Sequence, residues 1–476
     1  MFDKIHYASL TTIAQGIQSR EISPLELTRY MLERIETVDK QLLSYATVTA
    51  DRAMDAARLA EQEISAGGYR GPLHGMPIAV KDLCFTQGVR TMGGLKVLRD
   101  FVPSYDATVV SKLQSAGAII LGKLNLTEGA LSAYNPDFDI PVNPWGEKLW
   151  AGVSSSGSGV ATAAGLCFAS LGTDTGGSIR YPAMANGIVG LKPTYGRVSR
   201  HGVLALAESL DHVGPMTRST LDAAIVFQAI AGHDPNDPSS LHESVPDIVA
   251  GLSAESDPTS DLGDLRIGVD KRYISEGTDP GLVNAIETVI DTLQQRGAQL
   301  VDVTMPAAEP MELRNLWLPI CAYEALHAHA GNFPSRAEEY GGYFRGVLEM
   351  GASMTEQEYV AANAKRREFS RLFEAELAKV DAVVCPAGGF VFEADRQAQY
   401  GDSQALKPIV QHFQGQFTIP ADLAGTPGLI IPCGFSTYGR PYAVQFLGSR
   451  LSEHDLCRIG HAYEQATDWH LRHPPV

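Results

Sequence analysis

Short apolar runs alternate with longer amphipathic segments along most of the chain. The runs have the length of buried strands and predict strands over residues 76–80, 118–121, 188–191, 265–269, 381–386 and 428–432. The spacing of apolar residues predicts helices within residues 1–65, among them 50–64, and over 109–114, 160–168, 281–296 and much of 310–379. This alternation of strands and helices predicts a layered α/β fold.

Two local signals mark a helix start and a connection. Ser23, Pro24 and Glu26 combine an N-cap, a proline at the first helical position and an acid in the first turn, which predicts a helix start. Residues 251–264 are polar and predict a surface connection. Because the strands predicted on both sides of this connection are alike, we expect one sheet shared by both halves of the chain.

The composition is that of a soluble globular protein. Of 476 residues, 44% are apolar and 20% are charged, and the formal net charge is -17. This acid excess argues against nucleic acid or an anionic membrane surface as a partner. No apolar stretch reaches the roughly 18 residues that suggest a membrane span, and the first residues lack the apolar core of a signal peptide. We therefore expect a cytoplasmic protein.

The six cysteines lie singly along the chain, and none forms a CxxC pair. Most have apolar neighbours. This pattern favours buried free thiols in a reducing compartment over a disulfide framework or a zinc site.

Glycine and serine are densest in residues 151–159, Ala-Gly-Val-Ser-Ser-Ser-Gly-Ser-Gly. A flexible linker is one interpretation, but linkers rarely run straight into an apolar helix such as the one predicted over 160–168. We interpret the segment as a serine-bearing loop at a helix N-terminus, where amide N–H groups face an incoming negative charge.

A second loop of this kind follows at residues 172–180. Gly176 and Gly177 allow the backbone to approach a ligand closely and allow consecutive N–H groups to point one way. Ser178, at the end of such an anion nest, could attack a carbonyl carbon while the nest holds the resulting oxyanion. Taken alone, the segment is equally compatible with a plain turn.

Lys81 follows the apolar run 76–80, so its side chain starts from a buried position. A surface lysine is the usual case. Burial, however, lowers the pKa of a lysine from about 10.4 towards neutrality, and a neutral lysine can act as a general base.

Two other patterns are poor candidates for sites. Residues 117–124 nearly match a phosphate-binding loop, but Leu124 stands where the magnesium-binding hydroxyl belongs, and the interior is apolar and strand-like. His327 and His329 are two residues apart and would face away from each other on a helix, so we expect surface histidines and not a metal pair.

Lys81, Ser154 and Ser178, together with the sequence around them, resemble the amidase signature family. The matching segments are residues 75–82, 143–145, 152–159, 174–182, 190–194, 424–427 and 445–448. The likeness covers nearly the whole chain and is weakest over about 235–264. An ordered set of this length is far more specific than any single short motif.

The resemblance implies one α/β/α domain over residues 1–476, built around a large mixed, twisted sheet. Within it, residues 1–65 form N-terminal helices, 66–234 carry the core motifs, and 265–476 supply the rest of the sheet and the pocket helices. The family requires no metal and no cofactor. A homodimer is left open.

The resemblance also implies amide hydrolysis by a Ser–cisSer–Lys triad through an acyl-enzyme. Ser178 is the nucleophile, Ser154 passes the proton, and Lys81 is first base and then acid. The oxyanion hole is formed by the N–H groups of four consecutive residues, Thr175, Gly176, Gly177 and Ser178. Gly129 and Ala130, with parts of 310–345, are expected to contact substrate.

The chain departs from the common family pattern at three positions. Val153 stands where many members have glycine, Leu124 where many have threonine, and Asp422 where asparagine is common. We expect little chemical effect from the first two, which lie outside the triad, whereas Asp422 can alter the pocket or a helix cap.

The sequence suggests three functions to compare. The first is a free-standing amidase acting on a small-molecule carboxamide, an aryl amide or a carbamate. The second is the glutaminase component of an aminoacyl-tRNA amidotransferase, but such members often carry glutamine at Tyr181 and phenylalanine at Gly129. The third, a non-catalytic scaffold, conflicts with the presence of all three triad residues.

Overall fold

The computed structural model describes residues 4–253, 262–307 and 309–476. In these residues 11 strands form one mixed sheet in the order β1-β3-β2-β4-β6-β5-β10-β11-β9-β7-β8. The strands are β1 Tyr45–Val48, β2 Pro77–Lys81, β3 Ile119–Leu124, β4 Ala169–Asp174, β5 Val189–Lys192, β6 His212–Thr217, β7 Arg266–Val269, β8 Gln299–Asp302, β9 Ala382–Pro386, β10 Gly428–Phe435 and β11 Pro441–Leu447. Strands from the two halves of the chain meet where β5 pairs with β10, which confirms the expected shared sheet.

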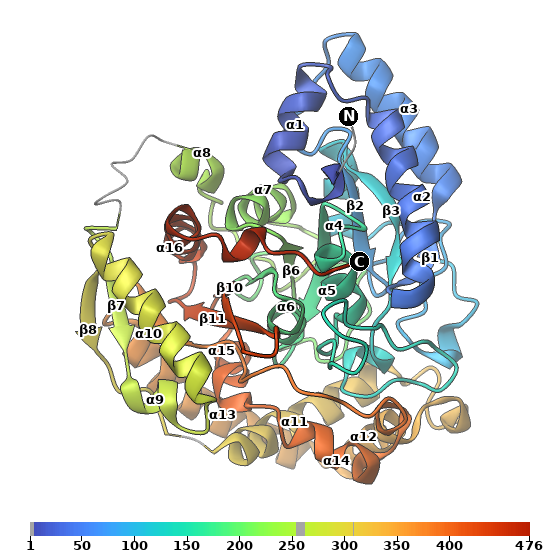
Figure 1. Ribbon diagram of the computed structural model, residues 1–476. Coiled ribbons are helices and arrows are strands. Elements are labelled where there is room, and N and C mark those ends of the chain that lie inside the picture. Colours follow the sequence, from blue (N-terminus) through green and yellow to red (C-terminus); the bar gives the residue numbers. More distant parts are fainter. Residues whose placement is uncertain (1–3, 254–261, 308) are drawn as a thin grey trace.

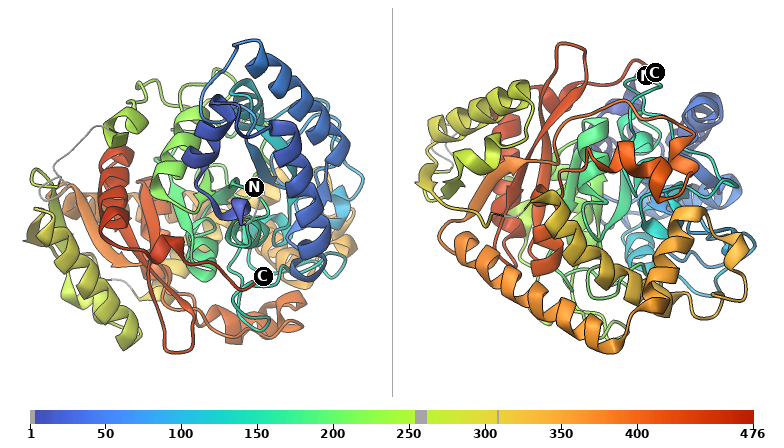
Figure 2. Two further views of the ribbon diagram at one scale, coloured as in Figure 1. Left: turned by 45° about the horizontal axis from the view of Figure 1, so that its top comes forward. Right: turned by 90° about the horizontal axis from the view of Figure 1, so that it is seen from below.

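Helices surround this sheet, with α1–α3 beside β1–β3 at one end and α9 and α10 beside β7 and β8 at the other (Figures 1 and 2). The helices are α1 Leu10–Gln18, α2 Pro24–Leu42, α3 Ala50–Ser65, α4 Thr108–Ser115, α5 Ser156–Ala163, α6 Arg180–Asn186, α7 Thr220–Ile230, α8 Ile248–Ser253, α9 Lys271–Ser275, α10 Pro280–Gln295, α11 Pro310–Ala328, α12 Gly342–Ser353, α13 Glu356–Leu377, α14 Ser403–Val410, α15 Ile419–Ala424 and α16 Glu453–Ala466. The layered α/β prediction is confirmed.

Several local predictions are confirmed to within three residues. The Ser23 side chain accepts a hydrogen bond from the Glu26 N–H and caps α2. Each predicted strand is present, for example β2 and β3 for the predicted runs 76–80 and 118–121. All six cysteines are buried and free.

The prediction of a helix over 160–168 is wrong at both ends. The helix α5 spans residues 156–163, and Gly165 then adopts a left-handed φ of 65° that turns the chain into β4. Only glycine adopts this conformation without strain, so the helix ends before it. Serine and glycine can begin a helix when their backbone groups are satisfied by tertiary contacts, which propensity alone does not indicate.

Five strands, β1, β4, β6, β8 and β11, were not predicted. The residues of β4, Ala-Ser-Leu-Gly-Thr-Asp, are all buried although four of the six are polar or lack a side chain. Their polar atoms are used inside the molecule, for instance in the hydrogen bond between Thr162 and Ser170. A buried polar strand of this kind shows neither an apolar run nor an alternating pattern.

The region 310–379 contains three helices, α11, α12 and α13, and the expectation of two surface histidines on it is half wrong. His327 is exposed, whereas His329 is buried beyond the end of α11 and contacts the Tyr340 hydroxyl through Nδ1 at 3.1 Å. Within the described residues no helix is long and apolar enough to cross a membrane. The expected connection 251–264 lies largely outside the described residues, and the division into one domain stays a prediction.

Candidate active site

Lys81 is the last residue of β2, and its side chain is completely buried. Its Nζ lies 2.7 Å from Ser154 Oγ, 2.9 Å from Ser155 Oγ and 2.8 Å from Thr173 Oγ1. The expected lysine and the first expected serine are therefore in direct contact, and two further hydroxyls complete the surroundings of the amine.

The number of protons in this cluster limits what each hydroxyl can do. The Ser155 hydroxyl donates to the Thr173 carbonyl oxygen at 3.2 Å, so towards Lys81 Ser155 acts as an acceptor. A neutral amine has two protons and one lone pair. With one proton given to Ser155, the lone pair is available to accept a proton from the hydroxyl of Ser154 or Thr173.

Burial lowers the pKa of Lys81 to about 7, and Cys84, Asp174 and Asp211 oppose this shift. Asp174 and Asp211 thus supply negative charge near the amine, whereas the adjacent Asp82 faces elsewhere and pairs with Lys123 at 3.3 Å. Because the lowered pKa is close to neutrality, a substantial fraction of the amine is uncharged at physiological pH.

The glycine- and serine-rich segment 151–159 is buried throughout and is not a linker. The peptide bond between Val153 and Ser154 is cis, as the family resemblance implied for this serine. The Ser155 N–H donates to the Ser178 carbonyl at 3.2 Å. This bond ties the loop that carries Ser154 to the loop that carries Ser178.

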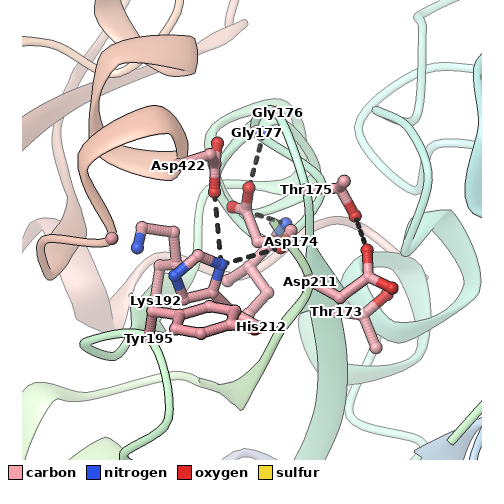
Figure 3. Close-up of polar contacts among 12 residues, drawn as sticks. Thr173, Asp174, Thr175, Gly176, Gly177, Lys192, Tyr195, Asp211, His212 and Asp422 are labelled. Carbon is pink, nitrogen blue, oxygen red and sulfur yellow. Dashed lines mark hydrogen bonds and ion pairs between the residues drawn. The ribbon is translucent and has the colours of Figure 1, made fainter. Parts of the chain in front are cut away.

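Asp174 holds the second loop from below, as Figure 3 shows for its contact with Gly177. Its carboxylate accepts hydrogen bonds from the N–H groups of Gly177 at 2.5 Å, Ile179 at 3.0 Å and Arg180 at 3.3 Å. The loop therefore closes around one buried carboxylate, which sets the directions of its peptide groups.

Two carbonyl contacts on the outer side fix the same loop. Trp317 Nε1 donates to the Thr175 carbonyl at 2.7 Å, and Thr418 Oγ1 donates to the Gly176 carbonyl at 2.8 Å. Because C=O and N–H point in opposite directions across a trans peptide, the Gly176 N–H faces away from Trp317. A Cβ at Gly176 would lie 2.9 Å from the Trp317 ring, so only glycine fits this close approach.

Of the four N–H groups expected in the oxyanion hole, three have no partner in the described part of the chain: those of Thr175, Gly176 and Ser178. The fourth, on Gly177, is already used by Asp174. An anion at this loop would meet three available donors, not four.

Ser178 is half-buried, so its side chain is accessible in a way that Ser154 is not. No hydrogen bond joins the Ser154 and Ser178 hydroxyls in the structure as described. The first contact of the expected relay, between Lys81 and Ser154, is therefore present. The second contact, between Ser154 and Ser178, would have to form when a substrate binds. Catalytic hydrogen bonds are often long before substrate binds.

Behind the loop lies a fully buried ionic cluster. The Arg180 guanidinium is 3.0 Å from Asp174 and 2.6 Å from Asp422. The Nδ1 of His212 is 3.5 Å from Asp422 (Figure 3). Burial would raise the pKa of Asp174, but Arg180 holds it well below its usual range. Burial and the neighbouring Asp174 raise the pKa of Asp422 well above the ordinary value, whereas Arg180 and Lys192 oppose this shift. Asp422, which stands where asparagine is common in the family, therefore belongs to this buried ionic cluster.

These opposite shifts predict opposite effects of two isosteric variants on stability. The lowered pKa of Asp174 contributes stability above the unfolded-state pKa of about 3.9, so Asp174→Asn should lower the free energy of unfolding by about 3–5 kcal/mol at pH 7. The raised pKa of Asp422 contributes stability that is lost as pH rises, so Asp422→Asn should gain relative to the parent from pH 5 to pH 9. Denaturant titrations across this range measure both. A larger loss for Asp422→Asn than for Asp174→Asn at pH 7 would contradict the assignment.

A cavity of about 910 Å³ adjoins the lysine cluster. Its walls include Thr173, Leu83 and Ala130 and four residues of α11: Tyr323, Glu324, His327 and Ala328. Ala130, one of the two expected substrate contacts, thus lines the cavity. The other, Gly129, packs against Phe344, where a Cβ would lie 2.5 Å from the ring. Neither Ser154 nor Ser178 lines the cavity, which meets the site at Thr173.

Sequence reasoning missed Ser155, Thr173 and Trp317, which position the lysine and the loop. Ser155 is adjacent to Ser154 and carries no signal that separates its role from that of its neighbour. Thr173 lies in the unpredicted strand β4, where alternation would have placed its side chain on the same face as Leu171. Trp317 comes from a distant helix, and nothing in its local sequence indicates its contact.

Comparison with known proteins shows which family and which relatives this chain resembles. The sequence model of the family described as Amidase matches residues 26–457. The Putative amidase AmiD of Mycobacterium tuberculosis is 44% identical over 474 residues, covering 100% of this chain and 97% of the relative. The A subunit of the Glutamyl-tRNA(Gln) amidotransferase of Geobacter metallireducens is 39% identical over 485 residues, covering 96% of each chain.

The solved structure of native peptide amidase from Stenotrophomonas maltophilia matches with a TM-score of 0.84 and 30% identity over 98% of each chain. The fold and these relatives define the class: this is a hydrolase that acts on the C–N bonds of amides. The chain belongs to the amidase signature family.

Proposed function

We propose that the protein hydrolyses a small-molecule carboxamide through an acyl-enzyme on Ser178. The observation that carries this proposal is the buried Lys81, whose Nζ lies 2.7 Å from Ser154 Oγ next to a loop with unpaired N–H groups. A buried amine with a pKa of about 7 can accept a proton near neutral pH, which an exposed lysine cannot.

The proposed steps use only groups of this chain. Ser178 Oγ attacks the carbonyl carbon as its proton passes through Ser154 to Lys81. The N–H groups of Thr175, Gly176 and Ser178 receive the oxyanion, and Gly177 is free to join them only if it leaves Asp174. The proton then returns through Ser154 to the leaving nitrogen. Water next attacks the acyl-enzyme by the same route and releases the acid.

The glutaminase role is the second candidate, and the relative from Geobacter metallireducens supports it. Tyr181, at a position where the glutaminase members often carry glutamine, favours the free-standing amidase instead. Its ring packs against Trp150 at 5.8 Å between ring centroids, and its hydroxyl contacts Thr418 at 3.0 Å. This aromatic packing beside the nucleophile loop favours a free-standing amidase.

A hydrolysis panel separates the candidates. Purified protein should release ammonia or amine from aliphatic amides or anilides without any partner, and it should act weakly on glutamine. A series of carbamates tests whether the protein also hydrolyses substrates with a second type of acyl group. Glutamine as the only substrate, hydrolysed only once a partner protein is present, would contradict the proposal and support the glutaminase.

A further inference from the structure

The cavity next to the lysine cluster has a chemical character that the catalytic groups do not explain. It begins at Thr173, whose hydroxyl contacts Lys81, and at Leu83, two residues beyond the lysine. It extends to Tyr323 and Glu324 on α11 and to Tyr359 on α13. With about 910 Å³ it is large enough for a substituent much bigger than a carboxamide group.

The charged residues that line the cavity are mainly acidic. The lining contains one guanidinium, that of Arg200, and four carboxylates, those of Glu208, Asp211, Asp237 and Glu324. Arg200 lies 3.8 Å from Asp237 and 5.0 Å from the centroid of the Tyr195 ring, so its charge is already matched within the wall. Three acidic side chains remain without a cation in the lining.

These three carboxylates differ in their contacts. Asp211 accepts hydrogen bonds from Thr175 Oγ1 at 2.6 Å and from two backbone N–H groups. Glu324 accepts from Ser209 and Tyr359, while Arg366 contacts Ser209 from outside the lining. The exposed Glu208 carboxylate makes no hydrogen bond and no ion pair within the described residues, so it is free to meet a ligand.

Two aromatic rings stand beside this acidic surface. Tyr323 and Tyr359 stack with 4.3 Å between ring centroids and an interplanar angle of 14°. The Tyr359 hydroxyl donates to Glu324 at 2.7 Å, which fixes the stack against the carboxylate. Aromatic faces together with carboxylates attract cations, because the ring quadrupole and the negative charge act in the same direction.

We propose that the protein prefers amides whose substituent carries a positive charge, an ammonium or amidinium group held in this cavity by Glu208 and the Tyr323–Tyr359 stack. The inference rests on the proposed amidase function and names its substrate class. Low-dielectric walls around an excess of one charge raise the local concentration of the opposite charge. An amide substrate that carries only a negative charge is correspondingly disfavoured.

Three substrates of equal length test the charge preference. They are 5-aminopentanamide, which carries an ammonium at pH 8, the neutral hexanamide, and the anionic 5-carbamoylpentanoate. An anilide pair, N-[4-(aminomethyl)phenyl]acetamide and N-(4-ethylphenyl)acetamide, places the same difference on the leaving amine. At low salt we expect kcat/KM for the cation to exceed that for the neutral compound by about tenfold in at least one series. The anion should be the poorest substrate, and added salt should reduce the differences.

Variants connect the preference to the cavity. Glu208→Gln should lower the ratio of kcat/KM between cationic and neutral substrates several-fold. The control Glu287→Gln removes one exposed charge from α10, outside the cavity, and should leave the ratio unchanged. Tyr323→Leu should lower the ratio as well, whereas Tyr323→Phe keeps the ring and should retain it.

The outcomes separate this inference from the proposed function. Hydrolysis of hexanamide with equal or lower kcat/KM for both cationic compounds would overturn the inference and leave the amidase function standing. A cation preference that persists fully in Glu208→Gln and in Tyr323→Leu would also overturn it. If no compound of either series is hydrolysed, and a broader amide panel gives the same result, the proposed function itself fails.

Discussion

Ser178→Ala is expected to lower kcat by several orders of magnitude on every amide substrate while the protein stays folded. Ser178 is the half-buried serine at the end of the loop with unpaired N–H groups, and its side chain makes no hydrogen bond within the described residues. Removal of a nucleophile typically costs a factor of about 10⁴–10⁶ in kcat, because the remaining donors and binding contacts supply only residual catalysis.

The measurement compares kcat and thermal unfolding of Ser178→Ala with those of Ser353→Ala. Ser353 lies at the exposed end of α12, and its variant should retain full activity. Both variants should unfold within a few degrees of the parent. Activity of Ser178→Ala within about tenfold of the parent would show that another group attacks the carbonyl.

The sequence was informative where the chemistry depends on local motifs. The lysine after an apolar run, and the two glycine- and serine-rich loops, are each visible within nine or so residues. The burial of Lys81, which lowers its pKa, follows from the position of β2 in the interior of the sheet, and the apolar run already indicated it.

The rest depended on contacts between distant segments. Asp174 and Arg180 lie in the recognised loop, but their partner Asp422 is 242 residues from Arg180, and no local pattern predicts that ion pair. The use of the Gly177 N–H by Asp174 likewise depends on how the loop folds back over its own strand. The acidic and aromatic walls of the cavity come from α11, α13 and the loop before β6, which only the fold brings together.

Activity is also expected to rise with pH through the pKa of Lys81. The base must be neutral, and burial lowers the pKa of this lysine to about 7. The neutral fraction therefore grows from about pH 6 and levels off above about pH 8, and kcat/KM should follow this limb. Burial raises the pKa of Asp211 to about 6, so this carboxyl titrates in a neighbouring range and needs its own variant.

Two variants identify the group whose titration causes the rise of kcat/KM with pH. Lys81→Ala should abolish it and cut amide hydrolysis by orders of magnitude, with a smaller loss on an activated ester, whose leaving group needs little protonation. Asp211→Asn should keep the limb but move it to lower pH, because the negative charge of Asp211 raises the pKa of Lys81. If the rise of kcat/KM with pH persists in Lys81→Ala, the lysine is not the base. If the rise is lost only in Asp211→Asn, the titrating group is the Asp211 carboxyl. Equal losses on ester and amide in Lys81→Ala would instead remove only the step in which the lysine returns the proton, since acylation of either substrate still needs a base.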